Sequence, residues 1–182
     1  MKTVPSLLLA AALAAASVPL RSSAGGTLEG SVNFGGALSY ATTTVAGSEF
    51  DLDLHGGVYV VDSVFAGGDL LVRDNKAVTA WEASAMGRFH FLDPWLSDEG
   101  GALRDFSPYV ALRLGYASGD NSAKDESGAL VAARLGCDFF ITDNFAVDLF
   151  VDASAATADV YPDKAKMEST QVRVHLGFDF FF

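Results

Sequence analysis

Hydrophobic and polar residues alternate along almost the whole chain after its first two dozen positions. Between Leu28 and Tyr40 the even positions carry apolar residues or glycine, and the odd positions between them carry Glu, Ser, Asn, Gly or Ala. A period of two is the pattern of a β-strand with one apolar and one polar face. The same alternation recurs and predicts eight strands, at about 27–40, 50–60, 64–73, 78–91, 107–117, 129–141, 145–154 and 171–182.

The segments between these strands are of two kinds. Asp62-Ser63 and Thr142-Asp143-Asn144 are short turns. The longer, polar segments predict loops at about 41–49, 74–77, 118–128 and 156–168, and an irregular, Gly-containing connection at 92–105. Strands of roughly ten residues joined in this way are typical of an outer-membrane barrel. We therefore predict an all-β fold: one eight-stranded antiparallel up-and-down transmembrane β-barrel.

The first 24 residues do not follow this pattern. A Met-Lys start, an apolar Leu- and Ala-rich stretch and the small residues Ser22-Ser23-Ala24 have the order of a secretory signal. Pro5 and Pro19 interrupt the stretch, which is shorter than the ~20 apolar residues that a spanning helix needs. We expect residues 1–24 to be a cleaved signal peptide and residues 25–182 to form the barrel.

The composition favours a membrane location for the predicted strands. Half of the residues are hydrophobic and the mean hydropathy is +0.27, yet no apolar run after residue 24 approaches the length of a spanning helix. Lipid offers no water to satisfy backbone N–H and C=O groups, so only helices and closed barrels cross it. An apolar chain of this kind must therefore cross as strands.

The charge and the cysteine content exclude other classes of protein. The chain has 23 acidic and 12 basic residues, and removal of Lys2 and Arg21 with the signal peptide would leave a net charge near −13. Nucleic-acid binding needs a basic surface and is not expected. Cys137 is the single cysteine and lies far from the signal-peptide junction, so neither an intramolecular disulfide nor a lipoprotein anchor is expected.

Alternation alone does not say which face is inside, because a soluble barrel of the lipocalin type also alternates, with its apolar face inward. Two observations favour a membrane barrel. The polar face is rich in Gly, Ala and Ser, which fit a crowded interior. The apolar face carries aromatic residues at the strand ends, where they would form girdles at the two lipid headgroup boundaries. The predicted girdle residues are Tyr40, Phe50, Trp81 and Tyr116 at one rim, and Phe89, Phe91, Phe139 and Phe145 at the other. Ordinary core aromatics are the alternative interpretation.

The last strand resembles the carboxy-terminal β-signal of outer-membrane proteins. It reads Val172-Arg173-Val174-His175-Leu176-Gly177-Phe178-Asp179-Phe180-Phe181-Phe182. With the segments 107–116 and 140–146 it makes residues 27–182 similar to the small OmpA, OmpX and opacity-type barrels. The resemblance implies that Phe178, Phe180 and Phe182 form an assembly signal read by the barrel-assembly machinery. It also implies contact with outer-membrane lipids and lipopolysaccharide.

The polar face would place many charged side chains in the lumen. The expected lumen charge network consists of Asp53, Asp69, Arg73, Glu82, Arg88, Arg113, Arg134, Asp138, Asp148, Asp152, Arg173 and His175. The same polar face of the strands also carries Glu29, Asp51, His55, His90 and Asp179. An eight-stranded barrel is just wide enough to be filled by side chains. Buried charges must be paired and hydrogen-bonded. We therefore interpret this set as a structural plug rather than an active site.

The turn positions predict individual pairs within this plug. A turn centred on Asp143 sets Arg134 opposite Asp152. The same register sets Asp138 opposite Asp148, a like-charge contact that is unfavourable unless an Arg or His from across the barrel, such as Arg113 or His175, reaches between the two carboxylates. Across the turn at Asp62-Ser63, the parity allows Asp53 to face Arg73.

Two classes of function remain open. The first is a non-enzymatic, monomeric surface protein that displays its loops to an extracellular ligand, as in adhesion. The second is a transporter or small pore that resembles the OmpW type. A hydrolase is not expected, because each of the three histidines lacks the serine two positions later that lipid A deacylases of this scaffold carry. No cofactor or metal is expected, and we interpret Asp120, Asp125 and Glu126 as a solvated acidic loop.

Overall fold

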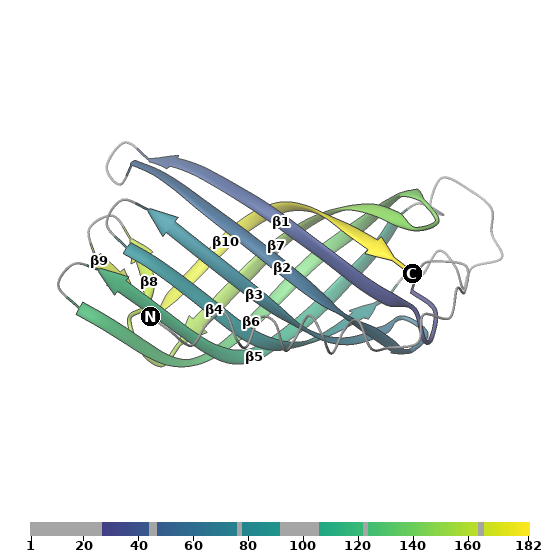
Figure 1. Ribbon diagram of the computed structural model, residues 1–182, viewed down its shortest axis with the longest axis horizontal. Coiled ribbons are helices and arrows are strands. Elements are labelled where there is room, and N and C mark those ends of the chain that lie inside the picture. Colours follow the sequence, from purple (N-terminus) through teal and green to yellow (C-terminus); the bar gives the residue numbers. More distant parts are fainter. Residues whose placement is uncertain (1–26, 44–46, 76–77, 92–105, 122–123, 164–165) are drawn as a thin grey trace.

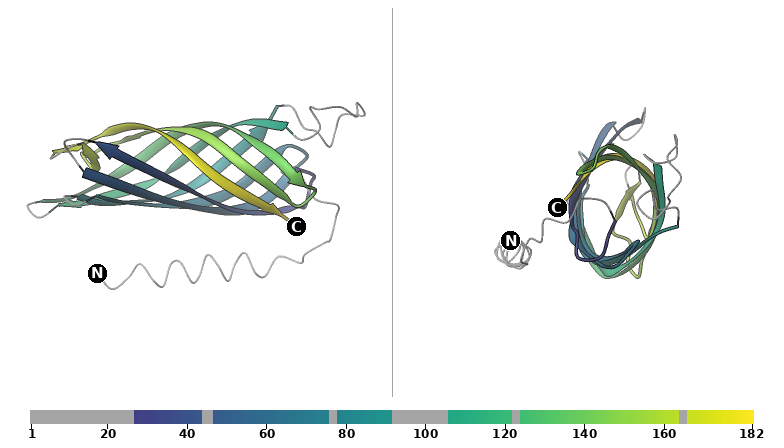
Figure 2. Two further views of the ribbon diagram at one scale, coloured as in Figure 1. Left: turned by 90° about the horizontal axis from the view of Figure 1, so that it is seen from above. Right: turned by 90° about the vertical axis from the view of Figure 1, so that its right-hand side faces the viewer.

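The computed structural model describes residues 27–43, 47–75, 78–91, 106–121, 124–163 and 166–182. The predicted signal peptide at 1–24 and the connection at 92–105 lie outside these residues. In the described part, eight long strands hydrogen-bond in the order β1-β10-β7-β6-β5-β4-β3-β2, and β2 pairs with β1 to close the ring. All pairs in the ring are antiparallel. The predicted fold class is confirmed (Figures 1 and 2).

The strands of the barrel are β1 (Val32–Thr43), β2 (Gly47–Val61), β3 (Val64–Asn75), β4 (Val78–His90), β5 (Phe106–Asn121), β6 (Lys124–Thr142), β7 (Phe145–Ala156) and β10 (Thr170–Phe181). Two short strands, β8 (Tyr161–Asp163) and β9 (Lys166–Glu168), pair with each other between β7 and β10. No helix in the described part of the chain is long and apolar enough to span a membrane.

Burial alternates along each strand and shows that the polar face is the inner one. On β7, Asp148, Phe150 and Asp152 are buried while Leu149 and Val151 are exposed. Large apolar side chains therefore cover the outside, as on Leu112, which is 67% exposed. Leu135, Leu149 and Leu176 are also exposed on this outer face, and Leu52 is half-buried.

Several predicted loops are too long, because the strands continue beyond the predicted ends. The loop predicted at 118–128 is mostly strand, since β5 runs to Asn121 and β6 begins at Lys124. The loops predicted at 41–49 and 74–77 shrink in the same way. The alternation disappears in these stretches because both faces of an extended strand are polar where both meet water. The strands remain hydrogen-bonded to each other there, although apolar and polar residues no longer alternate.

The first strand begins later than predicted, at Val32 rather than near residue 27. Gly30 has a φ of +86°, a conformation that interrupts a strand and that glycine adopts without steric cost. The chain before it folds against the β2 end, where Ser63 N donates to Thr27 O and Gly30 N donates to Tyr59 O. Glu29 consequently lies exposed at this turn and not in the lumen.

The register between β2 and β3 also differs from the prediction. Val61 pairs with Val64 across the short turn, but Tyr59 pairs with Phe65, so a bulge shifts the strands by one residue. Asp51 therefore stands opposite Arg73, and the residue opposite Asp53 is Leu71. The predicted pairing of Asp53 with Arg73 is therefore wrong. With Val61 paired to Val64, an unbroken register would place inward residues of β2 opposite outward residues of β3, and the bulge restores the match between the two polar faces.

The β8–β9 hairpin packs against the inner wall at one end of the barrel. Val160 and Tyr161 are buried against Ala117, Leu130 and Ala132 of the inner wall. The end-on view in Figure 2 shows this hairpin inside the outline of the ring. The guanidinium of Arg73 lies 5.5 Å from the Tyr161 ring centroid, so the hairpin contacts the charged interior directly.

Candidate functional site: the barrel lumen

Arg134 lies at the centre of the lumen and joins charges from four strands. It is buried, and its guanidinium lies 2.5 Å from Asp53 on β2, 3.2 Å from Asp152 on β7 and 3.4 Å from Asp69 on β3. The predicted pair of Arg134 and Asp152 is confirmed, both in register and as an ion pair. The Cζ atom of Arg134 also lies 3.9 Å from the Phe150 ring centroid.

Arg113 continues the chain of ion pairs around the wall. Each of its three nitrogens contacts a different carboxylate at 2.6 Å, on Asp69, Glu82 and Asp152. Since Asp69 and Asp152 also contact Arg134, the two arginines share two acids. A shared arrangement of this kind satisfies several donors of each guanidinium at once, which a buried charge requires.

A second group of charges lies nearer the β8–β9 end. Arg73 Nε donates to Asp51 at 3.0 Å, and Arg73 Nη1 lies 3.5 Å from Glu82. Arg173 contacts the other oxygen of Asp51 at 3.0 Å. Gln171 bridges this group, because its amide nitrogen donates to Glu82 at 3.0 Å and its oxygen accepts from Arg73.

The opposite part of the lumen is centred on Asp179. Its carboxylate lies 2.6 Å from His55 Nε2 and 2.9 Å from Arg88 Nη1. His55 Nδ1 lies 3.1 Å from Asp53 and thereby connects this group to Arg134. Asp51, His55 and Asp179 therefore belong to the network together with Asp53.

The like-charge pair of Asp138 and Asp148 is confirmed in register, but the two residues given as examples of a compensating cation, Arg113 and His175, are not between them. Arg113 contacts Asp69, Glu82 and Asp152 instead. Asp148 accepts a hydrogen bond from the Tyr109 hydroxyl, 2.9 Å from its nearer oxygen. Arg88 is the nearest arginine to Asp138, at 3.6 Å.

His175 faces the lumen as predicted, but it does not join the charge network. Its ring stacks on Phe150 with a centroid distance of 4.8 Å. Neither ring nitrogen has a hydrogen-bond partner among the described residues.

Aromatic residues fill the lumen at the end opposite the β8–β9 hairpin. The cluster consists of Ala37, Tyr59, Phe65, Met86, Tyr109, Ala111, Phe140, Ala146, Phe150 and Phe181, all buried. These residues were not predicted from the sequence as a lumen cluster, because only the charged residues of the inner face were considered. The signal was nevertheless present, since Tyr59, Phe65 and Phe150 occupy the polar parity of their strands.

A serine and a histidine also meet in this aromatic end. Ser107 Oγ lies 2.8 Å from His90 Nδ1, and the Tyr59 hydroxyl lies 3.0 Å from His90 Nε2. A serine beside a base is the arrangement of a nucleophile in hydrolases. Ser107 is, however, 0% exposed, so a substrate has no surface at which to reach it. We interpret the contact as a hydrogen bond that satisfies buried polar groups.

The predicted girdle residues point outward. Phe50, Phe89, Phe91, Tyr116 and Phe139 are exposed, and Trp81 and Phe145 are half-buried against neighbouring rings, with Trp81 beside Tyr116 and Phe145 beside Phe180. The side chain of Tyr40 lies outside the described residues. Phe178, Phe180 and Phe182 also point outward, whereas Phe181 between them is buried in the lumen.

The chain is similar in shape to several solved structures. The N-terminal β-barrel domain of OprF from Pseudomonas aeruginosa superposes with a TM-score of 0.58 at 18% identity, over 85% of this chain and 98% of that chain. Neisserial surface protein A (NspA) gives 0.57 at 14% identity, over 84% and 96% of the two chains. The chain has the fold of a small outer-membrane β-barrel.

OprG from Pseudomonas aeruginosa also matches this outer-membrane barrel fold, with a TM-score of 0.50 at 14% identity over 86% of this chain and 98% of that chain. No protein-family model matches the chain, and no curated protein matches it by sequence. The resemblance inferred from the strand pattern is thus confirmed at the level of the fold. At identities of 14–18% these matches concern the fold and not the charged residues of the lumen.

Proposed function

We propose that the chain is an integral outer-membrane protein with a non-enzymatic surface role, in which a barrel plugged by paired charges displays its loops outside the cell. The observation that carries the proposal is the cross-lumen network of Arg134 and Arg113. These two side chains contact acids from β2, β3, β4 and β7 and so occupy the middle of the ring. A lumen filled by a shared set of ion pairs supports a scaffold rather than a transport path.

The outer surface supports a location in lipid. Exposed apolar side chains continue around the ring on neighbouring strands, at Leu112, Leu135, Leu149, Val174 and Leu176 among others. A soluble barrel would have these residues inside. We therefore propose that outer-membrane lipid and lipopolysaccharide contact this band, and that the barrel-assembly machinery inserts it as a monomer.

The end that carries the β5–β6 and β8–β9 hairpins is the proposed outer end. Small outer-membrane barrels have short periplasmic turns and longer extracellular loops. The turns at Asp62-Ser63 and Thr142–Asn144 lie at the end that also holds Phe182. The opposite end holds the extended hairpins (Figure 1), which form the surface proposed for an extracellular ligand.

Single-channel recording in planar bilayers tests the closed lumen. The purified barrel should give no steady conductance, because Arg113 and Arg134 with their acids fill the cross-section. A variant with both arginines replaced by alanine should conduct if it folds, and it controls for incorporation into the bilayer. Steady conductance of the unchanged barrel would instead support the OmpW-like transporter or pore.

Labelling of intact cells tests which end is displayed. In a Cys137→Ala background, Asp125→Cys should react with a membrane-impermeant maleimide, because Asp125 lies exposed in the β5–β6 hairpin. Asp143→Cys, exposed in the opposite turn, should react only after the outer membrane is permeabilised. The reverse labelling pattern would contradict the proposed orientation.

A further inference from the structure

The described lumen contains more negative than positive charge. Its buried acids are Asp51, Asp53, Asp69, Glu82, Asp138, Asp148, Asp152 and Asp179, and its arginines are Arg73, Arg88, Arg113, Arg134 and Arg173. Eight acids against five arginines leave an excess of three. His55 reduces the excess to two if both of its ring nitrogens donate, to Asp53 and Asp179. Two negative charges then remain without a counter-ion.

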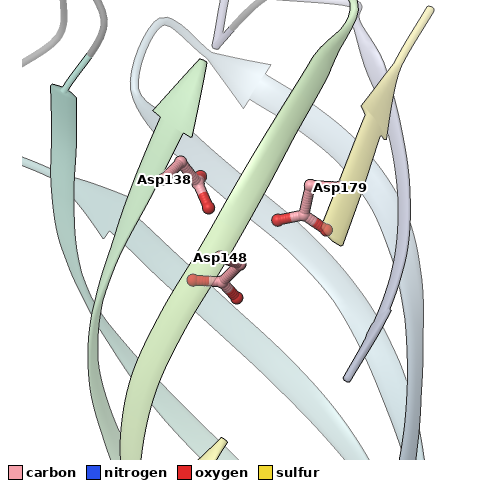
Figure 3. A group of neighbouring side chains, drawn as sticks. All are labelled: Asp138, Asp148 and Asp179. Atoms are coloured by element: carbon pink, nitrogen blue, oxygen red, sulfur yellow. The ribbon is translucent and has the colours of Figure 1, made fainter. Parts of the chain in front are cut away.

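The excess negative charge is concentrated at one place in the lumen. Asp138 on β6, Asp148 on β7 and Asp179 on β10 direct their carboxylates toward one another (Figure 3). One oxygen from each lies within 4.8 Å of the others, and all three residues are buried. Asp138 and Asp148 stand directly opposite each other across the β6–β7 pair. Like charges in that position are unfavourable unless something neutralises them.

Asp138 is the residue that points to a missing ligand. It is 0% exposed, yet neither of its carboxylate oxygens has a hydrogen-bond partner among the described residues. The nearest cationic groups are Arg88 Nη1 at 3.6 Å and His90 Nε2 at 3.8 Å from its Oδ2. A buried carboxylate that accepts no hydrogen bond is costly, and native structures normally satisfy such groups with protein, water or an ion.

The two neighbouring acids differ in how well they are compensated. Asp179 has His55 and Arg88 as ion-pair partners. Asp148 accepts hydrogen bonds from the neutral Tyr109 hydroxyl. The uncompensated charge therefore belongs to Asp138 and Asp148, and Asp179 completes a three-sided arrangement of oxygens around the space between them.

We propose that Asp138, Asp148 and Asp179 form a divalent-cation site for Ca²⁺ or Mg²⁺ inside the barrel wall. The ligand atoms are all carboxylate oxygens, which hard cations prefer. Two oxygens that each lie about 2.4 Å from one Ca²⁺ are at most about 4.8 Å apart, so the observed spacing permits a shared ion with small adjustments. A charge of +2 would neutralise the excess of two. Arg88 remains paired with Asp179, 2.9 Å from its Oδ2.

Terbium luminescence tests the site in the mature barrel, refolded in detergent micelles. Tb³⁺ replaces Ca²⁺ at oxygen sites, and the Tyr109 ring beside Asp148 would sensitise its emission. We expect saturable emission at one Tb³⁺ per barrel, reversed by Ca²⁺. The double variant Asp138→Asn with Asp148→Asn should lose it. The double variant Asp120→Asn with Asp125→Asn, which neutralises the exposed pair at the β5–β6 tip, should retain it.

Elemental analysis keeps the proposal testable if the lumen variant does not fold. The unchanged barrel, refolded with Ca²⁺ and then desalted, should retain about one equivalent of the ion. Retention of none, or Tb³⁺ emission that only the tip variant removes, would overturn the site. In that case the two excess charges would be neutralised by protons shared among the three carboxyl groups.

Discussion

Arg134 shows how one side chain can organise a barrel interior. It contacts Asp53, Asp69 and Asp152, which come from three strands other than its own. Because the group is fully enclosed, water cannot compensate these acids if the guanidinium is removed. The stability of the lumen therefore depends on this residue more than on charges at the mouth.

The variant Arg134→Met tests this dependence. It leaves three buried acids without their shared cation and should lower the free energy of unfolding by about 3–5 kcal/mol. Urea-dependent loss of heat-modifiable gel mobility measures the effect. Arg173→Met is the matched control and should cost less, because the Arg173 side chain is 15% exposed and reaches water. Equal losses in the two variants would contradict the central role of Arg134.

Leu149 tests the outward face in the same way. Its side chain is 46% exposed in the middle of β7. An arginine in the middle of the lipid-facing band costs roughly 2–4 kcal/mol, so Leu149→Arg should reduce insertion into vesicles. Thr142→Arg, exposed at the last residue of β6 beside the turn, should insert normally. Unchanged insertion of both variants would argue against a membrane barrel.

The residue-level predictions from sequence succeeded where parity decides the outcome. Arg134 and Asp152 were correctly predicted to pair because both positions follow from one turn and a period of two. Parity does not say how far a long side chain reaches across the lumen. The partners of Arg113 on β3 and β4 and the stacking of His175 on Phe150 therefore required the three-dimensional structure.

At the scale of elements, two glycines determine how β2 and β3 pack. Gly57 and Gly67 stand opposite each other, and the Phe65 ring lies over both. A Cβ on Gly57 would come within 2.5 Å of Gly67 Cα and 2.6 Å of Phe65 Cζ. The pair thus provides the space that an inward aromatic ring needs in the narrow lumen.

The variant Gly57→Ala should therefore destabilise the barrel by about 1–3 kcal/mol, the usual cost of overpacking. Gly87→Ala is the matched control, because a Cβ there would meet nothing within 4 Å. Differential unfolding in urea compares the two. If Gly57→Ala proved as stable as Gly87→Ala, the close packing of Phe65 would not be a constraint.

The end of β10 combines two properties that can be separated. Phe182 exchanges two backbone hydrogen bonds with Val32, each 2.9 Å long, and so closes the seam between the first and last strands. Its ring points outward and is the predicted assembly signal. Phe182→Ala should slow assembly in cells nearly as much as deletion of Phe182, because the resemblance assigns recognition to the ring. Pulse-labelled membrane fractions measure the rate of assembly. A normal rate in the alanine variant would show that Phe182 acts only through its backbone hydrogen bonds to Val32.

Element boundaries were predicted less well than element identity. The long β5–β6 hairpin was assigned as a loop because its polar residues lie on both faces, and sequence periodicity detects strands only where the two faces differ. The bulge near Val61 was likewise not predicted, although the consecutive exposed residues Val60 and Val61 interrupt the alternation there. The number of barrel strands and their order depended only on the apolar bands and was correct.

At the scale of the whole molecule, the charged groups lie where the surrounding solution does not reach them. The side chains of Asp53, Arg113 and Arg134 are 0% exposed, and Asp152 is 4% exposed. Mobile ions weaken interactions between charges that are exposed to solvent, with a Debye length of about 3 Å at 1 M salt, and they screen buried pairs much less. The barrel should therefore tolerate large changes in ionic strength. Its urea midpoint in 1 M NaCl should match that in dilute buffer, and a clear drop would indicate that electrolyte enters the lumen.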